Sequence, residues 1–197
     1  DAGPGLGTGS FAVVKTVKDR FTAQTYAAKI VDKTRWLKYL DCIQREVDIL
    51  RTLRHEHIIR LREVIDLPNT LYMITELASG GDLLDHIERH GPLNEAQARN
   101  VIGKTALALE YLHDVANVVH RDMKPENILL GGGGPLDPAV KLCDFGHSAF
   151  APRTESGTPA ASSGTSSEAF GTFIYLAPEV IVHKTYGRPM DMWSLGV

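Results

Sequence analysis

The stretch VVHRDMKPENILL, from Val118 to Leu130, restricts the fold and the chemistry of this chain more than any other segment. Short apolar runs of β type enclose it on both sides and are typical of strand ends. Pro125 excludes a helix between them, because proline lacks a backbone donor and clashes with the preceding helical turn. Most polar loops are solvated turns. This one places a potential base, a potential metal ligand and two cations within eight residues.

Composition and charge exclude several classes of protein. The 197 residues, 43% of them hydrophobic, suit one globular unit of one or two lobes. A formal charge of -3 without a basic block argues against a nucleic-acid partner. No apolar run approaches the roughly 20 residues that span a bilayer, so we expect no membrane segment. Two cysteines make no disulfide framework, which favours a cytoplasmic or nuclear location.

Two kinds of hydrophobic periodicity divide the chain. Four segments have the β-branched and aromatic content of strands: 10–19, 25–32, 57–66 and 70–78. Residues 34–55 repeat apolar side chains every three or four positions, which predicts a helix, and 94–113 predicts a second helix with a capping box at Asn94. We therefore expect an α+β fold, with a strand-rich lobe over residues 1–77 and a helix-rich lobe over residues 78–197.

The stretch GLGTGSFAVV, from Gly5 to Val14, could bring backbone N–H groups close to phosphates. A plain glycine turn is the alternative. No Gly-Lys-Ser/Thr follows, which excludes a Walker A loop. The stretch leads into a strand, whereas the Rossmann fingerprint requires a helix there.

Lys29 and Glu46 are charged residues at positions predicted to be buried. Lys29 shares a strand face with Ala27 and Val31, and Glu46 lies in the apolar stripe of the following helix. Each charge is costly to bury alone, and pairing offsets part of that cost. The pair is either a structural salt bridge or, beside a glycine loop, a means of gripping nucleotide phosphates.

Six ordered motifs together resemble the eukaryotic protein kinases: GTGSFAVV, AAK, the helical Glu46, HRDMKPEN, CDFG and GTFIYLAPE. The resemblance covers essentially the whole chain. It implies a bilobal fold with a small β-rich N-lobe and a larger α-helical C-lobe. Measured against that pattern, we expect the chain to be truncated at both ends.

The resemblance implies ATP and Mg²⁺ as cofactors and assigns a role to each charged motif residue. Asp122 would orient the substrate hydroxyl and accept its proton, and Lys124 would steady the transferred phosphoryl group. Asn127 and Asp144 match the two magnesium ligands. Lys29 would hold the α- and β-phosphates. The implied catalytic set is Asp122, Lys124, Asn127, Lys29 and Glu46.

The resemblance also implies a nucleotide site between the lobes. Ala27 and Leu129 would sandwich the adenine, backbone groups of Glu76 and Ala78 would bind its edge, and Thr75 would stand behind it. Besides Lys29 and Asp144, the implied nucleotide contacts are Leu6, Gly7, Thr8, Gly9, Ser10, Val14, Ala27, Thr75, Glu76, Ala78, Asp82 and Leu129.

Lys124 and Thr172 match the serine/threonine kinase pattern, and the motifs look most like the calcium/calmodulin-dependent group. The implied partners are protein substrates. Asp82 and Glu126 would face the peptide groove and favour an arginine upstream of the acceptor, three residues before it. The alternative is that Asp82 only bonds the ribose and Glu126 is solvated.

Arg121 would await a phosphate from the activation loop. Glu168 stands where relatives carry a phosphorylatable threonine, so it is a candidate for a permanent negative charge toward Arg121. The alternative is a solvated Glu168, with Ser166 or Ser167 modified instead.

Two other functions are compatible with parts of the pattern. A pseudokinase scaffold would normally have lost Lys29, Asp122 or Asp144, and all three are present. A small-molecule kinase is disfavoured because GTFIYLAPE resembles a peptide-positioning segment. Beside these motifs, we expect His147 to be an exposed, inert imidazole and Cys143 to be a buried packing thiol.

Overall fold

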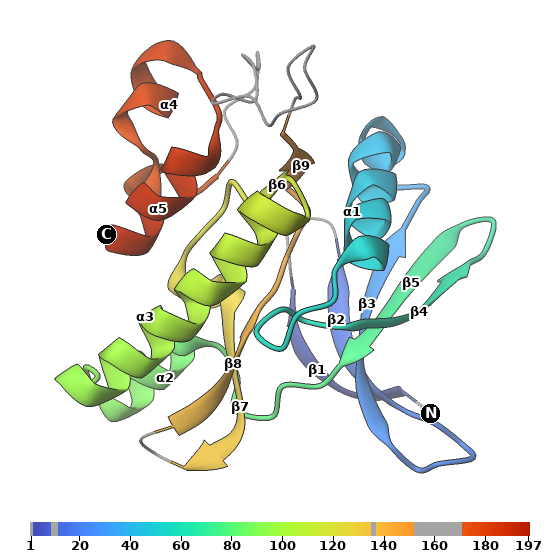
Figure 1. Ribbon diagram of the computed structural model, residues 1–197. Helices are drawn as coiled ribbons and strands as arrows, with labels where there is room; N and C mark the ends of the chain where they lie inside the picture. Colours follow the sequence, from blue (N-terminus) through green and yellow to red (C-terminus); the bar gives the residue numbers. More distant parts are fainter. Residues whose placement is uncertain (1, 9–11, 135–136, 152–170) are drawn as a thin grey trace.

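The computed structural model describes residues 2–8, 12–134, 137–151 and 171–197. Figure 1 shows a sheet with helix α1 on one side of the molecule and helices α2 to α5 on the other. The α+β fold expected from the sequence is confirmed. No helix in these described ranges has the length and apolar character needed to cross a membrane.

The first part of the chain forms a five-stranded antiparallel sheet in the order β1-β2-β3-β5-β4. Its strands are β1 (Ala2–Thr8), β2 (Val13–Lys18), β3 (Thr25–Asp32), β4 (Leu61–Asp66) and β5 (Thr70–Glu76). The β2–β3 turn is held by Asp19, whose Oδ1 accepts from the backbone N–H groups of Phe21 and Thr22 at 2.8 and 2.9 Å. The sheet thereby brings Lys29, on the central strand β3, opposite α1.

Helix α1 (Leu40–Thr52) is shorter than the predicted segment 34–55, and a 3-10 turn over Leu37–Tyr39 precedes it. The reason lies in Asp32, whose Oδ1 accepts from both the N–H and the hydroxyl of Thr34 at 3.0 and 2.6 Å. This local bond competes with a helical start. The buried face of α1 carries Ile43, Glu46, Val47, Ile49 and Leu50, so Glu46 is the one carboxylate in an apolar stripe.

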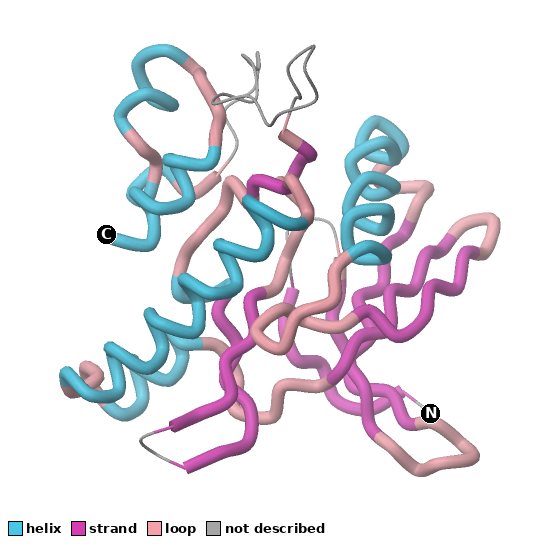
Figure 2. The backbone as a smooth tube through the Cα atoms, viewed as in Figure 1, coloured by secondary structure: helices cyan, strands magenta, loops and turns pink. Residues whose placement is uncertain are grey.

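Helices dominate the rest of the chain: α2 (Leu83–His90), α3 (Glu95–Glu110), α4 (Pro178–His183) and α5 (Arg188–Gly196). Two small antiparallel sheets of two strands each stand among them, as Figure 2 shows in magenta. One pairs β6 (Val118–Val119) with β9 (Ala149–Phe150), and the other is the hairpin of β7 (Ile128–Gly134) and β8 (Asp137–Leu142). The predicted capping box of α3 is confirmed: Asn94 and Gln97 exchange side-chain to backbone bonds at 3.0 Å. A π-helical turn over Tyr111–Val115 replaces the predicted last turn of that helix.

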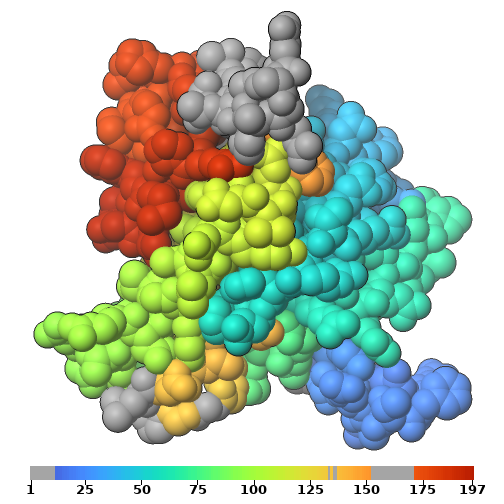
Figure 3. Space-filling model, viewed as in Figure 1, coloured from blue at the N-terminus to red at the C-terminus, as the bar shows by residue number. Residues whose placement is uncertain are grey.

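One hydrophobic cluster joins the sheet part to the helical part. It includes Val31 and Val47 from the first, and Leu109, Leu112 and Phe145 from the second. In Figure 3 the surface of the α1–β4 connection (teal) abuts that of α3 and its following turn (yellow-green). The two parts therefore share a core.

The link between the sheet part and the helical part, residues 76–82, is hydrogen-bonded directly to β7. Gly80 N–H donates to the Leu130 carbonyl, and Leu130 N–H donates to the Gly81 carbonyl, each at 2.8 Å. The approach is so close that a Cβ on Gly80 would lie 2.8 Å from the Leu130 oxygen. Only glycine fits there without a backbone shift.

We expect Gly80→Ala to lower the free energy of unfolding by about 1–3 kcal/mol, because the added methyl overlaps the Leu130 carbonyl. Gly103→Ala is the matched control. Gly103 lies in α3 with nothing within 4 Å of an added Cβ, so the higher helix propensity of alanine should make that change neutral or stabilising. Urea unfolding of both variants measures the difference, and equal effects would contradict the steric account.

Candidate active site

Lys29 is the centre of a three-residue charge cluster. Its Nζ donates to Glu46 Oε1 at 2.6 Å and to Asp144 Oδ1 at 2.9 Å. The three residues come from β3, α1 and the loop after β8, so the cluster joins the sheet part to the helical part. Burial alone would lower the pKa of Lys29, but the two carboxylates outweigh it and raise the pKa above its ordinary value. Lys29 is therefore a permanent cation facing two carboxylates.

The two carboxylates of this cluster differ in their surroundings. Burial raises the pKa of Glu46, whose side chain is only 6% exposed. Lys29 instead holds the pKa of Asp144 well below its usual range, at about 2. The Asp144 side chain is 40% exposed, so it is the carboxylate of the cluster that a ligand can reach.

The catalytic loop predicted around Asp122 is held by Asp191, a fully buried carboxylate on α5. Asp191 accepts from His120 N–H at 2.8 Å, from Arg121 N–H at 2.9 Å and from His113 Nε2 at 2.7 Å. Arg121 has a left-handed backbone with φ of +70°, which is costly for a residue with a side chain. The bonds to Asp191 hold the loop in this conformation.

Asp122 is buried and surrounded by donors. Lys124 Nζ lies 2.9 Å from its Oδ2, while Thr172 donates to its Oδ1 from both the backbone N–H and the hydroxyl at 3.0 Å. Asn127 Nδ2 also donates to Asp122, to Oδ2 at 3.1 Å and to the carbonyl at 2.7 Å. Burial raises the pKa of Asp122, but the bonds from Lys124 and Thr172 outweigh it, so the net pKa is lowered. Asp122 is an ionised acceptor at neutral pH.

The oxygen atoms near Asp144 fit a magnesium ion. The described hydrogen bonds of Asp144 go to Oδ1, and Asn127 uses its Nδ2 on Asp122, which leaves Asp144 Oδ2 and Asn127 Oδ1 for a cation. Mg²⁺ prefers such oxygen ligands, needs few from the protein and keeps part of its water shell. Within the described part of the chain, no cluster of three or more His, Cys, Asp or Glu offers a different metal site.

The strands place several predicted nucleotide contacts in register. Gly7 pairs with Val14 and Val14 pairs with Lys29, while Ala27 pairs with Thr75. Leu6 and Thr8 belong to β1, and Leu129 belongs to β7, where it bridges to Asp82. Gly9 and Ser10 lie outside the described residues. These nucleotide contacts stay predictions.

The link residues predicted to bind the adenine edge have other bonds as well. Glu76 N–H donates to the Arg60 carbonyl at 3.0 Å, so this N–H is engaged within the protein. The Glu76 side chain accepts from Arg60 N–H at 2.9 Å and pairs with Lys141 at 2.8 Å. The groups left for an adenine edge are the carbonyl of Glu76 and the backbone of Ala78.

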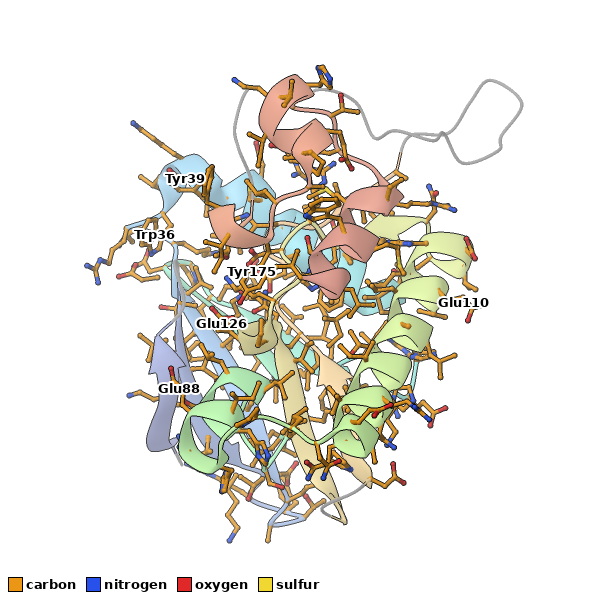
Figure 4. The ribbon with its side chains drawn as sticks, turned by 90° about the vertical axis from the view of Figure 1, so that its left-hand side faces the viewer. Trp36, Tyr39, Glu88, Glu110, Glu126 and Tyr175 are labelled. Atoms are coloured by element: carbon orange, nitrogen blue, oxygen red, sulfur yellow. The ribbon has the colours of Figure 1, made fainter. Side chains whose placement is uncertain are left out.

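Asp82 and Glu126, predicted to face a peptide, have different surroundings. Asp82 caps α2, since its Oδ1 accepts from Asp85 N–H at 2.8 Å. The capping role was missed, although an aspartate directly before a helical pattern could have indicated it. Glu126, labelled in Figure 4, lies in a short 3-10 turn (Pro125–Asn127) that contacts α2. Its Oε2 is buried and has no hydrogen-bond partner among the described residues. The alternative of a solvated Glu126 is wrong for this oxygen.

Arg121 is only 9% exposed, and its guanidinium lies over the ring of Tyr186, 5.2 Å from the centroid. Burial lowers the pKa of Arg121, and nearby Arg45 lowers it further. Glu168, the predicted counter-charge, lies outside the described residues, as do Ser166 and Ser167. The Tyr186 contact was missed because no local pattern connects two residues so far apart in the chain.

His147 and Cys143, for which no catalytic role was predicted, can also be compared with their expected surroundings. His147 is half-buried, so the expected exposed imidazole is wrong in that respect. Burial raises the pKa of the Cys143 thiol, and Asp144 beside it adds to the effect, which keeps this cysteine protonated and poorly nucleophilic. Cys143 packs against the main core, as expected of a packing thiol, but it is half-buried and not fully buried.

The low pKa of Asp144 makes a prediction about acid stability without added metal. A carboxyl whose folded pKa is depressed contributes stability above its unfolded pKa and loses it as the pH falls through the folded pKa. Between about pH 4 and about pH 2, the difference in unfolding free energy between wild type and Asp144→Asn should therefore shrink.

Denaturant unfolding across that range measures this difference. The same pair of measurements in a Lys29→Met background is the control, because Lys29 is the main cause of the low pKa. The pH dependence should largely disappear there. A difference that stays constant with pH in the wild-type background would contradict the assignment.

Comparisons with known proteins agree on one family. The family model described as "Protein kinase domain" matches residues 2–197. The chain is 38% identical over 200 residues to CBL-interacting protein kinase 9 of Oryza sativa subsp. japonica, covering 100% of this chain and 41% of the relative. It is 42% identical over 194 residues to Serine/threonine-protein kinase SIK2 of Gallus gallus, covering 98% and 23%.

A third relative, Myosin light chain kinase A of Dictyostelium discoideum, is 40% identical over 194 residues, with 98% of this chain and 62% of the relative covered. The chain thus spans less than two thirds of the length of each of these three relatives. Because the family model matches almost every residue, the chain belongs to the protein kinase domain family.

Proposed function

We propose that this chain catalyses the transfer of the γ-phosphoryl group of ATP to serine and threonine hydroxyls of proteins, with Mg²⁺. The observation that carries the proposal is the position of Asp122, a buried and ionised carboxylate in contact with Lys124, Asn127 and Thr172. When bound, Mg·ATP supplies the phosphoryl group and neutralises its charge. The protein supplies position and fixed charges.

Asp122 is suited to orient a hydroxyl. Its Oδ1 accepts a hydroxyl donor in this structure, from Thr172 at 3.0 Å, so a substrate hydroxyl can bond the same carboxylate. The lowered pKa makes Asp122 a weak base. That suits phosphoryl transfer, whose loose transition state depends more on positioning than on strong basicity. Asp122 would take the proton of the substrate hydroxyl as its new O–P bond forms and the bond between the γ-phosphorus and ADP breaks.

Lys29 on β3 and Lys124 in the loop after β6 each supply a positive charge to the proposed site. Glu46 orients Lys29 from α1, so that the lysine can bond phosphate oxygens without losing its buried partner. Lys124 Nζ lies within 2.9 Å of both Asp122 and Thr172 and is placed to steady the transferred group. Its contact with Thr172 supports the serine/threonine assignment over a tyrosine kinase.

The competing function is a pseudokinase scaffold that binds nucleotide and partners without turnover. Such a protein would lack one of the charged groups, yet Lys29, Asp122 and Asp144 are all present and bonded to the neighbours that the chemistry requires. This favours an active enzyme.

Asp122→Asn tests the proposal. We expect this change to reduce kcat by about 100-fold or more, because the acceptor of the hydroxyl proton is lost, with little change in the affinity for Mg·ATP. Asp144→Asn should weaken Mg·ATP binding as well. Phosphate transfer to a basic peptide and calorimetric nucleotide titration measure the two effects. Equal activity of Asp122→Asn and wild type would refute the assignment.

We also propose that the substrate carries an arginine upstream of the acceptor, three residues before it. Support comes from Glu126, a half-buried carboxylate beside α2 whose Oε2 has no hydrogen-bond partner among the described residues, so that a substrate guanidinium pairing with this side chain could supply a missing donor. A peptide array should show a preference for arginine at that position, and Glu126→Gln should reduce it. Glu88→Gln, at an exposed position of α2, is the control and should leave the profile unchanged. A wild-type profile without basic preference would exclude this substrate class.

A further inference from the structure

The backbone of Arg121 is fixed on several sides. Asp191 accepts its N–H at 2.9 Å, and Ser148 Oγ donates to the carbonyl of the preceding His120 at 3.1 Å. The Arg121 carbonyl lies so close to Gly171 that a Cβ there would be 2.7 Å away. Gly171 precedes Thr172, which contacts Asp122. A movement of Arg121 would therefore displace the Thr172–Asp122 contact.

The side chain of Arg121 is a buried cation whose hydrogen bonding is incomplete among the described residues. Its Nε is buried without a hydrogen-bond partner among the described residues, and Arg45 from α1 adds positive charge nearby. A buried cation in such a place is costly unless something offsets the lost hydration. Two described groups do so: the carboxylate of Asp191, which also accepts the Arg121 N–H, and the ring of Tyr186, whose centroid lies 5.2 Å from the guanidinium carbon.

Tyr186 is a rigid support. It precedes α5, is 1% exposed, and packs in a cluster with Leu176, Val180 and Met190. An aromatic face attracts a cation through its quadrupole, and the attraction is strongest where water is excluded. At this contact the guanidinium of Arg121 lies over the ring of Tyr186, and both residues are buried from water.

We propose that Tyr186 is a positioning residue for catalysis. Its ring holds the guanidinium of Arg121 by a cation–π contact and thereby keeps the catalytic loop in place before any anion reaches Arg121. The inference rests on the proposed kinase function. It makes Tyr186 a contributor to basal activity, and a negative charge from Glu168, or from phosphate on Ser166 or Ser167, would add to an arginine that is already placed.

The experiment is a double-mutant cycle on the full protein that contains this chain, after phosphatase treatment. The variants are Tyr186→Leu, Tyr186→Phe and Arg121→Met, with both double combinations. Tyr186→Leu should lower kcat by about 2- to 30-fold, the range that a cation–π contact supports, with the KM for ATP nearly unchanged. Tyr186→Phe keeps the ring face and should retain most of the activity. In the Arg121→Met background, Tyr186→Leu should cause no further loss of kcat.

Two results would overturn the inference. Equal loss from Tyr186→Leu in both backgrounds would mean that the ring only fills space, and equal damage from Phe and Leu would assign the effect to the hydroxyl. The same cycle measured by chemical unfolding needs no activity, and coupling should appear there too. An inactive wild type would refute the proposed function, while the unfolding cycle would still decide whether Tyr186 holds Arg121.

Discussion

The buried carboxylate of Asp191 is the interaction on which the active site depends. A charge with no exposed surface is unfavourable unless nearly all its acceptor capacity is used, and three donors from two segments use it. Because two of those donors are consecutive backbone N–H groups, the carboxylate fixes a peptide conformation as well as a position. The left-handed backbone of Arg121 is the result, and Asp122 is oriented by it.

A second constraint joins the two halves of the molecule. Lys29 contacts one carboxylate on α1 and another after β8, so three elements must be in place before its charge is balanced. The shared core contains side chains of the same three elements, Val31, Val47 and Phe145, and the Gly80–Leu130 bonds tie the two halves together at a second place. Electrostatics and packing therefore favour one arrangement of the halves, and in that arrangement Asp144 Oδ2 and Asn127 Oδ1 have no hydrogen bond among the described residues.

Local patterns predicted more of the fold than of the site. The strands, the buried face of α1 and the Asn94 cap follow from periodicity and capping chemistry, which act within a few residues. The predicted start of α1, at Thr34, was too early, because the Thr34 hydroxyl donates to Asp32 Oδ1 and this local bond competes with a helical start. The pairing of Lys29 with Glu46 could be inferred from faces. Contacts of Asp191 with His113, and of Tyr186 with Arg121, join distant segments and left no local signal.

The β7–β8 hairpin can vary in length without moving Asn127 and Asp144, the residues next to its base. Ile128 pairs with Leu142, and Leu130 with Val140, so the two strands are in fixed register next to Asn127 and Asp144. Beyond Leu130 the register shifts by one residue, and Gly133 and Gly134 pair with Pro138 and Asp137. A hairpin of this kind grows outward from its base. Residues added as matched pairs preserve which side chains face each side, whereas a single added residue reverses them or forms a bulge. The sequence distance between the two proposed magnesium ligands can therefore change toward the tip, by matched pairs or by a shift like the one after Leu130, while the pairs from Ile128 to Leu130 keep the base of the hairpin in register.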